Sequence, residues 1–205
     1  MRKILRFFFS AFLLSIIVWV VNPKQAEAVS FNKSTSDVYW FSESFKVKGA
    51  SSYLATHDRG AYVKFDTSQL TPDDAVTLWW VVFNNPASCT QGQGGYHCGE
   101  GDLTDPDVQA SVLHASGKLI NRSGSAHFTS YLPINNINGA LFGPGLLNPE
   151  TADIHFVVRT HGSKITELLY DQLHTFDGGC NNSTASTGSP GPNTCEDIQF
   201  AVHEN

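Results

Sequence analysis

The stretch AVTLWWVVFNNPASC, residues 75–89, decides the fold of this chain. Alternate side chains of a strand point to opposite faces of its sheet. In this stretch Trp79, Val81 and Phe83 share one face. The other face is equally apolar, with Val76, Leu78, Trp80 and Val82. Both faces must therefore be covered, which predicts a central strand under two layers.

Weaker strand patterns surround this segment. They are aromatic or β-branched runs, or alternations of apolar and polar residues, at positions 38–41, 45–48, 60–66, 108–116, 126–132, 153–161 and 197–203. In the last of these we expect Ile198, Phe200 and Val202 to face the core. Only residues 165–173, ITELLYDQL, have helical spacing. Strands separated by Gly, Pro and Asn turns, with at most one short helix, predict an all-β fold, an antiparallel β-sandwich or jelly roll.

The N-terminus has the parts of a secretory signal peptide. Basic residues fall within the first six positions, an apolar run covers 7–21, and Ala-Glu-Ala at 26–28 is a small-x-small cleavage site. The apolar run is shorter than the roughly 20 residues of a membrane span. We therefore expect residues 1–28 to be a cleaved signal peptide. Residues 29–205 would be a single β-sandwich domain, secreted to the extracellular space or the periplasm, with no membrane span left.

The predicted mature chain is acidic. The signal removes four of the 13 basic residues and one of the 19 acidic ones, which leaves nine against 18 and a net charge of −9. Nucleic acids and anionic membranes bind basic surfaces, so neither is expected as a partner. The expected partner is an extracellular ligand, a carbohydrate or a protein. A platform for sugar rings would use Tyr39, Trp40, Tyr96 and Tyr131, although aromatic strand residues more commonly lie in a core.

All four cysteines lie in the predicted mature chain, where export favours disulfides. We expect the pairs Cys89–Cys98 and Cys180–Cys195, because each pair brackets a stretch rich in Gly, Asn, Ser or Thr that has little means of ordering itself. Closing a loop of about 15 residues is worth roughly 3 kcal/mol in the chain-entropy model. The alternative is a Cys/His metal site that includes His97, which the absence of a Cys-x-x-Cys motif disfavours.

One acidic loop is the best metal candidate in the sequence. Ca²⁺ prefers several oxygen ligands from a flexible loop, and alternating acids and glycines can supply them. The acids here are Glu100, Asp102, Asp105 and Asp107. Their spacing differs from that of an EF-hand. The loop therefore predicts structural calcium, the one candidate cofactor, and a solvated acidic loop is the alternative.

Histidines on strand faces suggest a different metal site. His155 and His203 fall at positions predicted to face solvent. A catalytic metal centre would need further groups from neighbouring strands: His114 or His127, and Asp153 or Asp197. No Gly-x-Ser-x-Gly motif is present, so the nucleophile turn of a serine hydrolase is not indicated. A blue-copper site usually includes a methionine ligand, and the single methionine is Met1, within the predicted signal peptide. A secreted metal-dependent enzyme using strand-face histidines is thus the alternative to a secreted, non-catalytic binding or surface-associated module.

Several segments together resemble a family of secreted bacterial proteins. They are WWVVFNNPASC, CGEGDL, HASGKL, LFGPGLLNP, VVRTHG, TFDGGC and DIQFAVH, which run through most of the chain from about residue 60 onward. This resemblance brings no catalytic or binding residue to the chain. The segment VVRTHG is also similar, over one strand, to the chordin-type (CHRD) β-sandwich domain, which implies the same fold class.

Overall fold

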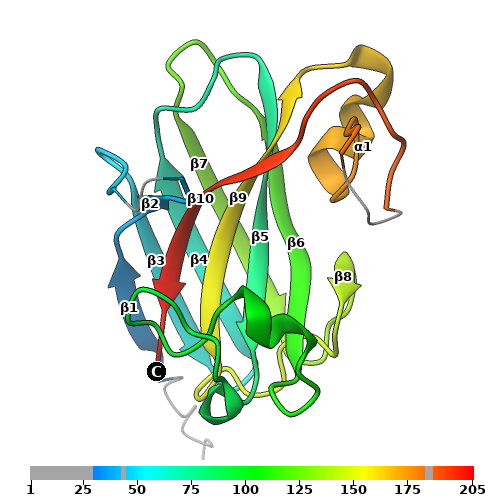
Figure 1. Ribbon diagram of the computed structural model, residues 1–205. Coiled ribbons are helices and arrows are strands. Elements are labelled where there is room, and N and C mark those ends of the chain that lie inside the picture. The colour runs from blue at the N-terminus through cyan, green and yellow to red at the C-terminus, as the bar shows by residue number, and fades with distance from the viewer. Residues whose placement is uncertain (1–29, 43–44, 183–186) are drawn as a thin grey trace, which may run out of the picture.

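The doubly apolar segment forms β5 (Asp74–Phe83), a central strand of the larger of two sheets. In the computed structural model, which describes residues 30–42, 45–182 and 187–205, β5 lies between β6 (Ala110–Leu119) and β9 (Asp153–Ser163) and pairs with both in antiparallel fashion (Figure 1). Every residue of β5 after Asp74 is buried. The prediction of a strand covered on both faces is therefore confirmed.

Two antiparallel sheets make up the fold. The larger has the order β2-β10-β9-β5-β6-β8, in which the remaining strands are β2 (Tyr39–Trp40), β8 (Ala140–Phe142) and β10 (Glu196–His203). The smaller has the order β1-β3-β4-β7, with β1 (Asn32–Ser36), β3 (Ser51–His57), β4 (Gly60–Thr67) and β7 (Ala126–Pro133). This arrangement confirms the predicted all-β antiparallel fold. The predicted signal peptide, residues 1–28, lies outside the described residues.

The helical content is low, as predicted. Residues 165–173 were expected to form one helix, and they form a 3₁₀ turn, Thr166–Leu168, followed by α1 (Leu169–His174). Two further 3₁₀ turns, Pro86–Ser88 and Glu100–Thr104, lie in the long connection between β5 and β6. Among the described residues, no helix is both long and apolar enough to cross a membrane.

The main core lies between the two sheets. Phe65 of the smaller sheet contacts Phe156 of the larger one edge-on, with ring centroids 6.2 Å apart, and Trp80 packs against the same Phe156 at 4.8 Å. All three side chains are almost fully buried. Burying a large apolar side chain contributes roughly 1.5–3 kcal/mol relative to exposure, so this layer is the main source of stability.

A second apolar cluster lies on the outer face of the larger sheet. It contains Trp79, Val81 and Phe83 of β5 together with Val108 and Cys98. Among the described residues, no second sheet covers this face. Its cover consists of the β5–β6 connection and the segment around α1, which in Figure 1 lie near opposite ends of the sheet. Irregular segments cannot fill a flat sheet surface as completely as a facing sheet does, and they leave a cavity there.

The facing of β10 differs from the prediction. Ile198 packs against the main core as expected, but the next residue, Gln199, also points inward and bonds to Thr67 and to the Ser68 carbonyl. Phe200 and Val202 consequently face outward, toward the cavity. The physical reason is a β-bulge between Asp197 and Gln199, which inserts a residue and reverses the alternation beyond it.

Candidate functional site

The outer face of the larger sheet forms the floor of a cavity of about 530 Å³. The floor is apolar except for His155 and extends over four adjacent strands. Its apolar residues are Val112 from β6, Trp79, Val81 and Phe83 from β5, Val157 from β9, and Phe200 and Val202 from β10. Strand alternation explains this set, because the neighbours of these residues along each strand point into the main core instead. A small-molecule site typically has this size and this kind of lining.

The first wall of the cavity is the loop closed by the Cys89–Cys98 disulfide together with the 3₁₀ turn after it; Tyr96 of the loop and Leu103 of the turn face the cavity. The predicted pairing is confirmed, with Cα atoms 5.1 Å apart. The buried carboxylate of Asp102 organises this loop by accepting hydrogen bonds from the backbone N–H groups of Thr90, Gln91 and Gly99, at 2.8–3.2 Å. Burial acts to raise the pKa of Asp102, but these donors outweigh it and the pKa is lowered.

The second wall is Phe176, which follows α1. Its ring meets Trp79 edge-on at 5.3 Å, and the guanidinium of Arg159 lies 3.9 Å from its centroid on the other side. Arg159 also donates to the Phe176 carbonyl at 3.0 Å and to Asp197 at 2.8 Å. A cation stacked on an aromatic ring and fixed by two hydrogen bonds holds the wall in position.

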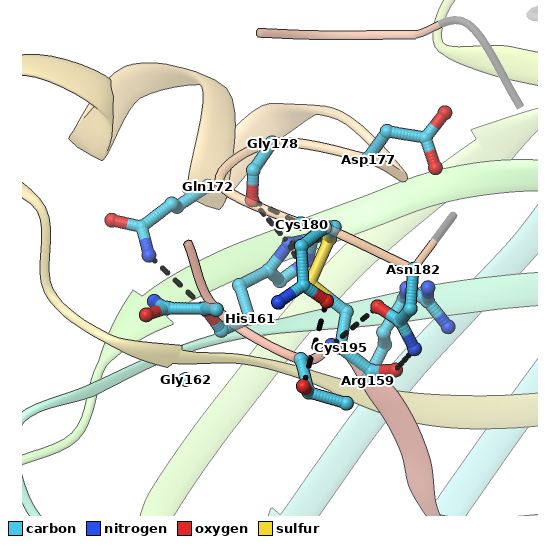
Figure 2. The surroundings of a disulfide bond; sticks show 12 residues. Arg159, His161, Gly162, Gln172, Asp177, Gly178, Cys180, Asn182 and Cys195 are labelled. Carbon is cyan, nitrogen blue, oxygen red and sulfur yellow. Dashed lines mark hydrogen bonds between the residues drawn. A yellow bond between two sulfur atoms is a disulfide. The ribbon is translucent and has the colours of Figure 1, made fainter. Parts of the chain in front are cut away.

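The Cys180–Cys195 disulfide lies beside the buried ring of His161 (Figure 2), and Cys180 Sγ is 3.8 Å from the carbonyl oxygen of Phe176. Trp79 Nε1 donates to Thr77 Oγ1 at 2.7 Å. The Thr77 hydroxyl donates to His161 Nε2, 2.9 Å away, because Nδ1 of that neutral ring faces a carbonyl and carries the proton. His161 Nδ1 then donates to the Gly178 carbonyl at 2.9 Å. Burial lowers the pKa of His161 to about 4, against the opposing effect of that carbonyl. His161 is thus a neutral structural residue.

His155 is the polar group of the cavity floor. Its ring lies 4.9 Å from Phe83 and 6.3 Å from Tyr96, measured between centroids. Its Nε2 atom is buried and has no hydrogen-bond partner among the described residues. Burial, and secondarily the nearby His203, lower the pKa of His155 to about 4, so the imidazole is neutral at neutral pH. A neutral imidazole among aromatic rings offers one polar contact to an otherwise apolar ligand.

The structure does not bring His155 and His203 into one metal site. His155 faces the outer cavity, whereas His203 points inward between the sheets, where its Nδ1 and Nε2 bond to the hydroxyls of Ser34 and Ser52 at 2.7 and 2.8 Å. The other predicted partners are also separated. His114 bonds to the Leu173 carbonyl, and His127 pairs with Asp66 of β4. The geometry gives no support to an enzyme that uses converging strand-face histidines.

The four acids of the predicted calcium loop do not gather either. Asp102 has its oxygens occupied by backbone donors, Asp105 accepts from the backbone of Asp107 at 2.9 Å, and Glu100 borders the cavity. In the described part of the chain, no group of three ligating side chains within 4.8 Å of one another includes Glu100, Asp105 or Asp107. Calcium in this loop stays a prediction.

The proposed sugar platform is not assembled. Tyr131 lies on the smaller sheet beside His57, whereas Tyr39 and Trp40 lie on the larger sheet. Tyr39 stacks on Phe200 at 5.7 Å, and Tyr96 lines the cavity. Phe176 and Val157 are cavity residues that the sequence did not single out, and Phe200 and Val202 were expected in the core. A preference for apolar residues at alternate positions of β10 was visible, but its direction was misassigned because of the bulge.

No protein-family model, no curated protein and no solved structure matches this chain. The resemblances to a secreted bacterial family and to the CHRD domain therefore remain predictions. Function is inferred from the cavity itself.

Proposed function

We propose that this protein is a secreted, non-catalytic β-sandwich module that binds a small, mostly apolar molecule in the cavity on the outer face of its larger sheet. The single observation that carries this proposal is the cavity of about 530 Å³, which is floored by Trp79, Phe83 and Phe200 and bordered by the imidazole of His155. Small-molecule sites commonly combine an apolar lining with few polar groups.

The lining restricts the chemistry of the ligand. Aromatic and aliphatic side chains on the floor favour a flat ring or a branched hydrocarbon body, because each apolar Å² removed from water contributes about 25 cal/mol. The imidazole of His155 borders the cavity and favours one hydroxyl, carbonyl or amide group on the ligand, placed against the floor. Further polar groups would lie at the rim, near Gln93, Glu100 and Asp197. A free sugar, with hydroxyls on every side, fits this lining poorly.

Export is the second part of the proposal. The charged, apolar and small-residue parts at the N-terminus support a signal peptide. The two disulfides support an oxidising compartment, since such bonds are rare in the cytosol. Expressing the gene with its native N-terminus and determining the N-terminal residue of the exported protein tests this directly. Cleavage after Ala28 is expected, and full-length protein retained inside the cell would contradict it.

Filling the cavity tests the binding function. Val157 lies on its floor, and Val157→Phe adds a ring where the ligand would sit. Thr129→Phe is the matched control, because Thr129 is an exposed strand residue on the smaller sheet. We expect a neutral, environment-sensitive dye such as Nile red to bind saturably to the wild type and to Thr129→Phe. Its affinity for Val157→Phe should fall by roughly tenfold, about 1.4 kcal/mol.

Trp79 provides an internal reporter for the same experiment, since its indole lies on the cavity floor. Dye binding should quench its emission by energy transfer in the wild type. Equal affinity for the wild type and Val157→Phe, or an absence of saturable binding to the wild type, would overturn the proposal.

A further inference from the structure

A group of metal-ligating side chains lies beside the cavity, in a combination that the sequence did not indicate. His97 of the disulfide-closed loop, Asp153 at the start of β9 and Glu204 just after β10 each offer a ligand atom, and these atoms lie within 4.8 Å of one another. The three residues are far apart in sequence. Their convergence is therefore a product of the fold.

The charges of this group are poorly balanced without a cation. The Asp153 side chain is completely buried, and its Oδ2 lies 3.3 Å from His97 Nδ1 while its Oδ1 accepts from the backbone N–H of Asn205 at 2.8 Å. Glu204 Oε1 accepts from the backbone N–H of His97 at 2.5 Å. Within residues 30–42, 45–182 and 187–205, no lysine or arginine forms an ion pair with either carboxylate. Two carboxylates at this separation repel unless a positive charge lies between them.

The other two groups of this kind in the described chain cannot bind a metal through all three members. One is His161 with Cys180 and Cys195, and the other is Asp102 with Cys89 and Cys98. Their cysteines are joined in disulfides, and metals bind the thiolate. His97, Asp153 and Glu204 include no cysteine, and one oxygen of each carboxylate, Asp153 Oδ2 and Glu204 Oε2, accepts no backbone N–H from the described residues.

We propose that His97, Asp153 and Glu204 bind one divalent transition-metal ion of the zinc type. An imidazole nitrogen with two carboxylate oxygens is a ligand set that suits Zn²⁺, with water in the fourth position. Ca²⁺ favours six or more oxygen ligands, and the imidazole disfavours it here. Because His97 follows Tyr96, the ion would fasten the first wall of the cavity to the sheet. Asp153 and His155 are two residues apart on the same face of β9, which puts the ion next to the polar end of the floor.

The test uses the whole mature protein, freed of metal by a chelator and titrated calorimetrically with Zn²⁺, with Co²⁺ as a spectroscopic probe. One ion per chain is expected. Bound Co²⁺ should give the intense visible absorption bands that are typical of a metal site with few ligands. His97→Ala and Glu204→Gln should each weaken binding by at least about tenfold. Both residues lie at or near the surface, so these variants should fold, which circular dichroism checks; Asp153, being buried, is left intact.

Two matched controls keep the result specific. His127→Ala removes another exposed histidine that pairs with an aspartate, Asp66, but has no second carboxylate in its group. Glu100→Gln removes an acid of the β5–β6 connection. Both should bind Zn²⁺ like the wild type. An absence of saturable Zn²⁺ binding, binding unchanged in His97→Ala and Glu204→Gln, or binding lost in Glu100→Gln would each overturn the proposal. Dye binding by the metal-free protein reports on the cavity separately, so the two proposals can fail independently.

Discussion

His155 has two opposing effects: its side chain lowers the stability of the fold, and in the proposed function it contacts the ligand. Its buried Nε2 atom has no hydrogen-bond partner among the described residues, which lowers the stability of the fold. The rest of the His155 ring borders the cavity. The same side chain therefore connects the stability of the protein with its proposed function.

Replacing His155 by phenylalanine separates the two effects. We expect His155→Phe to raise the free energy of unfolding by about 1 kcal/mol, because it removes an unsatisfied polar atom from apolar surroundings while keeping a flat ring. Urea denaturation at pH 7.5 measures this change. His127→Phe, at an exposed strand position, is the control and should change stability little. A loss of stability in His155→Phe would show that the Nε2 atom has a partner in solution.

At the level of single residues the sequence identified both disulfides but misjudged the histidines. Cysteine pairing follows from loop composition and spacing, which are local. The surroundings of His155 depend on a loop about 60 residues earlier in the chain that folds back over β9, and strand alternation alone cannot reveal such a cover. His97 meets Asp153 and Glu204 for the same kind of non-local reason.

Among the elements, β5 was the most predictable, because an apolar pattern on both faces has few alternatives to a central strand. The orientation of β10 was predicted wrongly because one bulge between Asp197 and Gln199 reverses its alternation. Bulges leave no clear mark in composition, so this error could not have been avoided from periodicity alone.

The two disulfides support the two walls of the cavity, and removing them should have different effects. Changing both Cys89 and Cys98 to serine opens a short loop, with a sequence separation of 9, and should release Tyr96 from the cavity. We expect stability to fall by about 2–3 kcal/mol and dye affinity to fall with it.

The corresponding change of Cys180 and Cys195 opens a longer loop, with a separation of 15, and should lower stability by about 3 kcal/mol or more. His161 would then lose the disulfide that packs beside its ring. Thermal denaturation of both double variants checks the order. A smaller effect for the Cys180 and Cys195 pair would indicate that β9 and α1 hold the second wall without it.

Across the whole molecule, three buried histidine rings lie where parts distant in sequence meet. His161 bonds β9 to the segment after α1, and His203 bonds β10 to β1 and β3. His155 lies between the sheet and the loop that contains Tyr96. Burial is the main cause that lowers the pKa of each to about 4. The unfolded chain, in which histidine has its ordinary pKa of about 6.5, therefore binds more protons than the native protein between pH 4 and 6.5.

The sign of the pH dependence follows from this difference. The stability that the neutral histidines contribute should be fully present above pH 6.5 and should be lost progressively as the pH falls toward 4. The melting temperature is the measurement. His203→Gln should be less stable at pH 7.5 but should lose less stability on acidification, since one titrating group is gone. A flat melting temperature between pH 7 and 4.5 would contradict the buried, neutral state of these rings.

The two sheets also differ in what their outer surfaces offer to other molecules. The smaller sheet presents exposed polar and aromatic side chains such as Tyr62 and Tyr131, whereas the larger sheet is covered except at the cavity.

The larger sheet ends on each side in a very short strand, β2 with two residues and β8 with three. Unpaired backbone at a sheet margin is what allows one chain to add itself to another as an extra strand, and so to start aggregation. Here each edge strand pairs with its neighbour at only two positions, and strands this short offer an added chain little backbone with which to pair. Concentrated samples of the protein should therefore resist forming fibrils through the larger sheet. A ligand would be recognised at this sheet by its shape and polarity, and not by backbone hydrogen bonds to a strand edge.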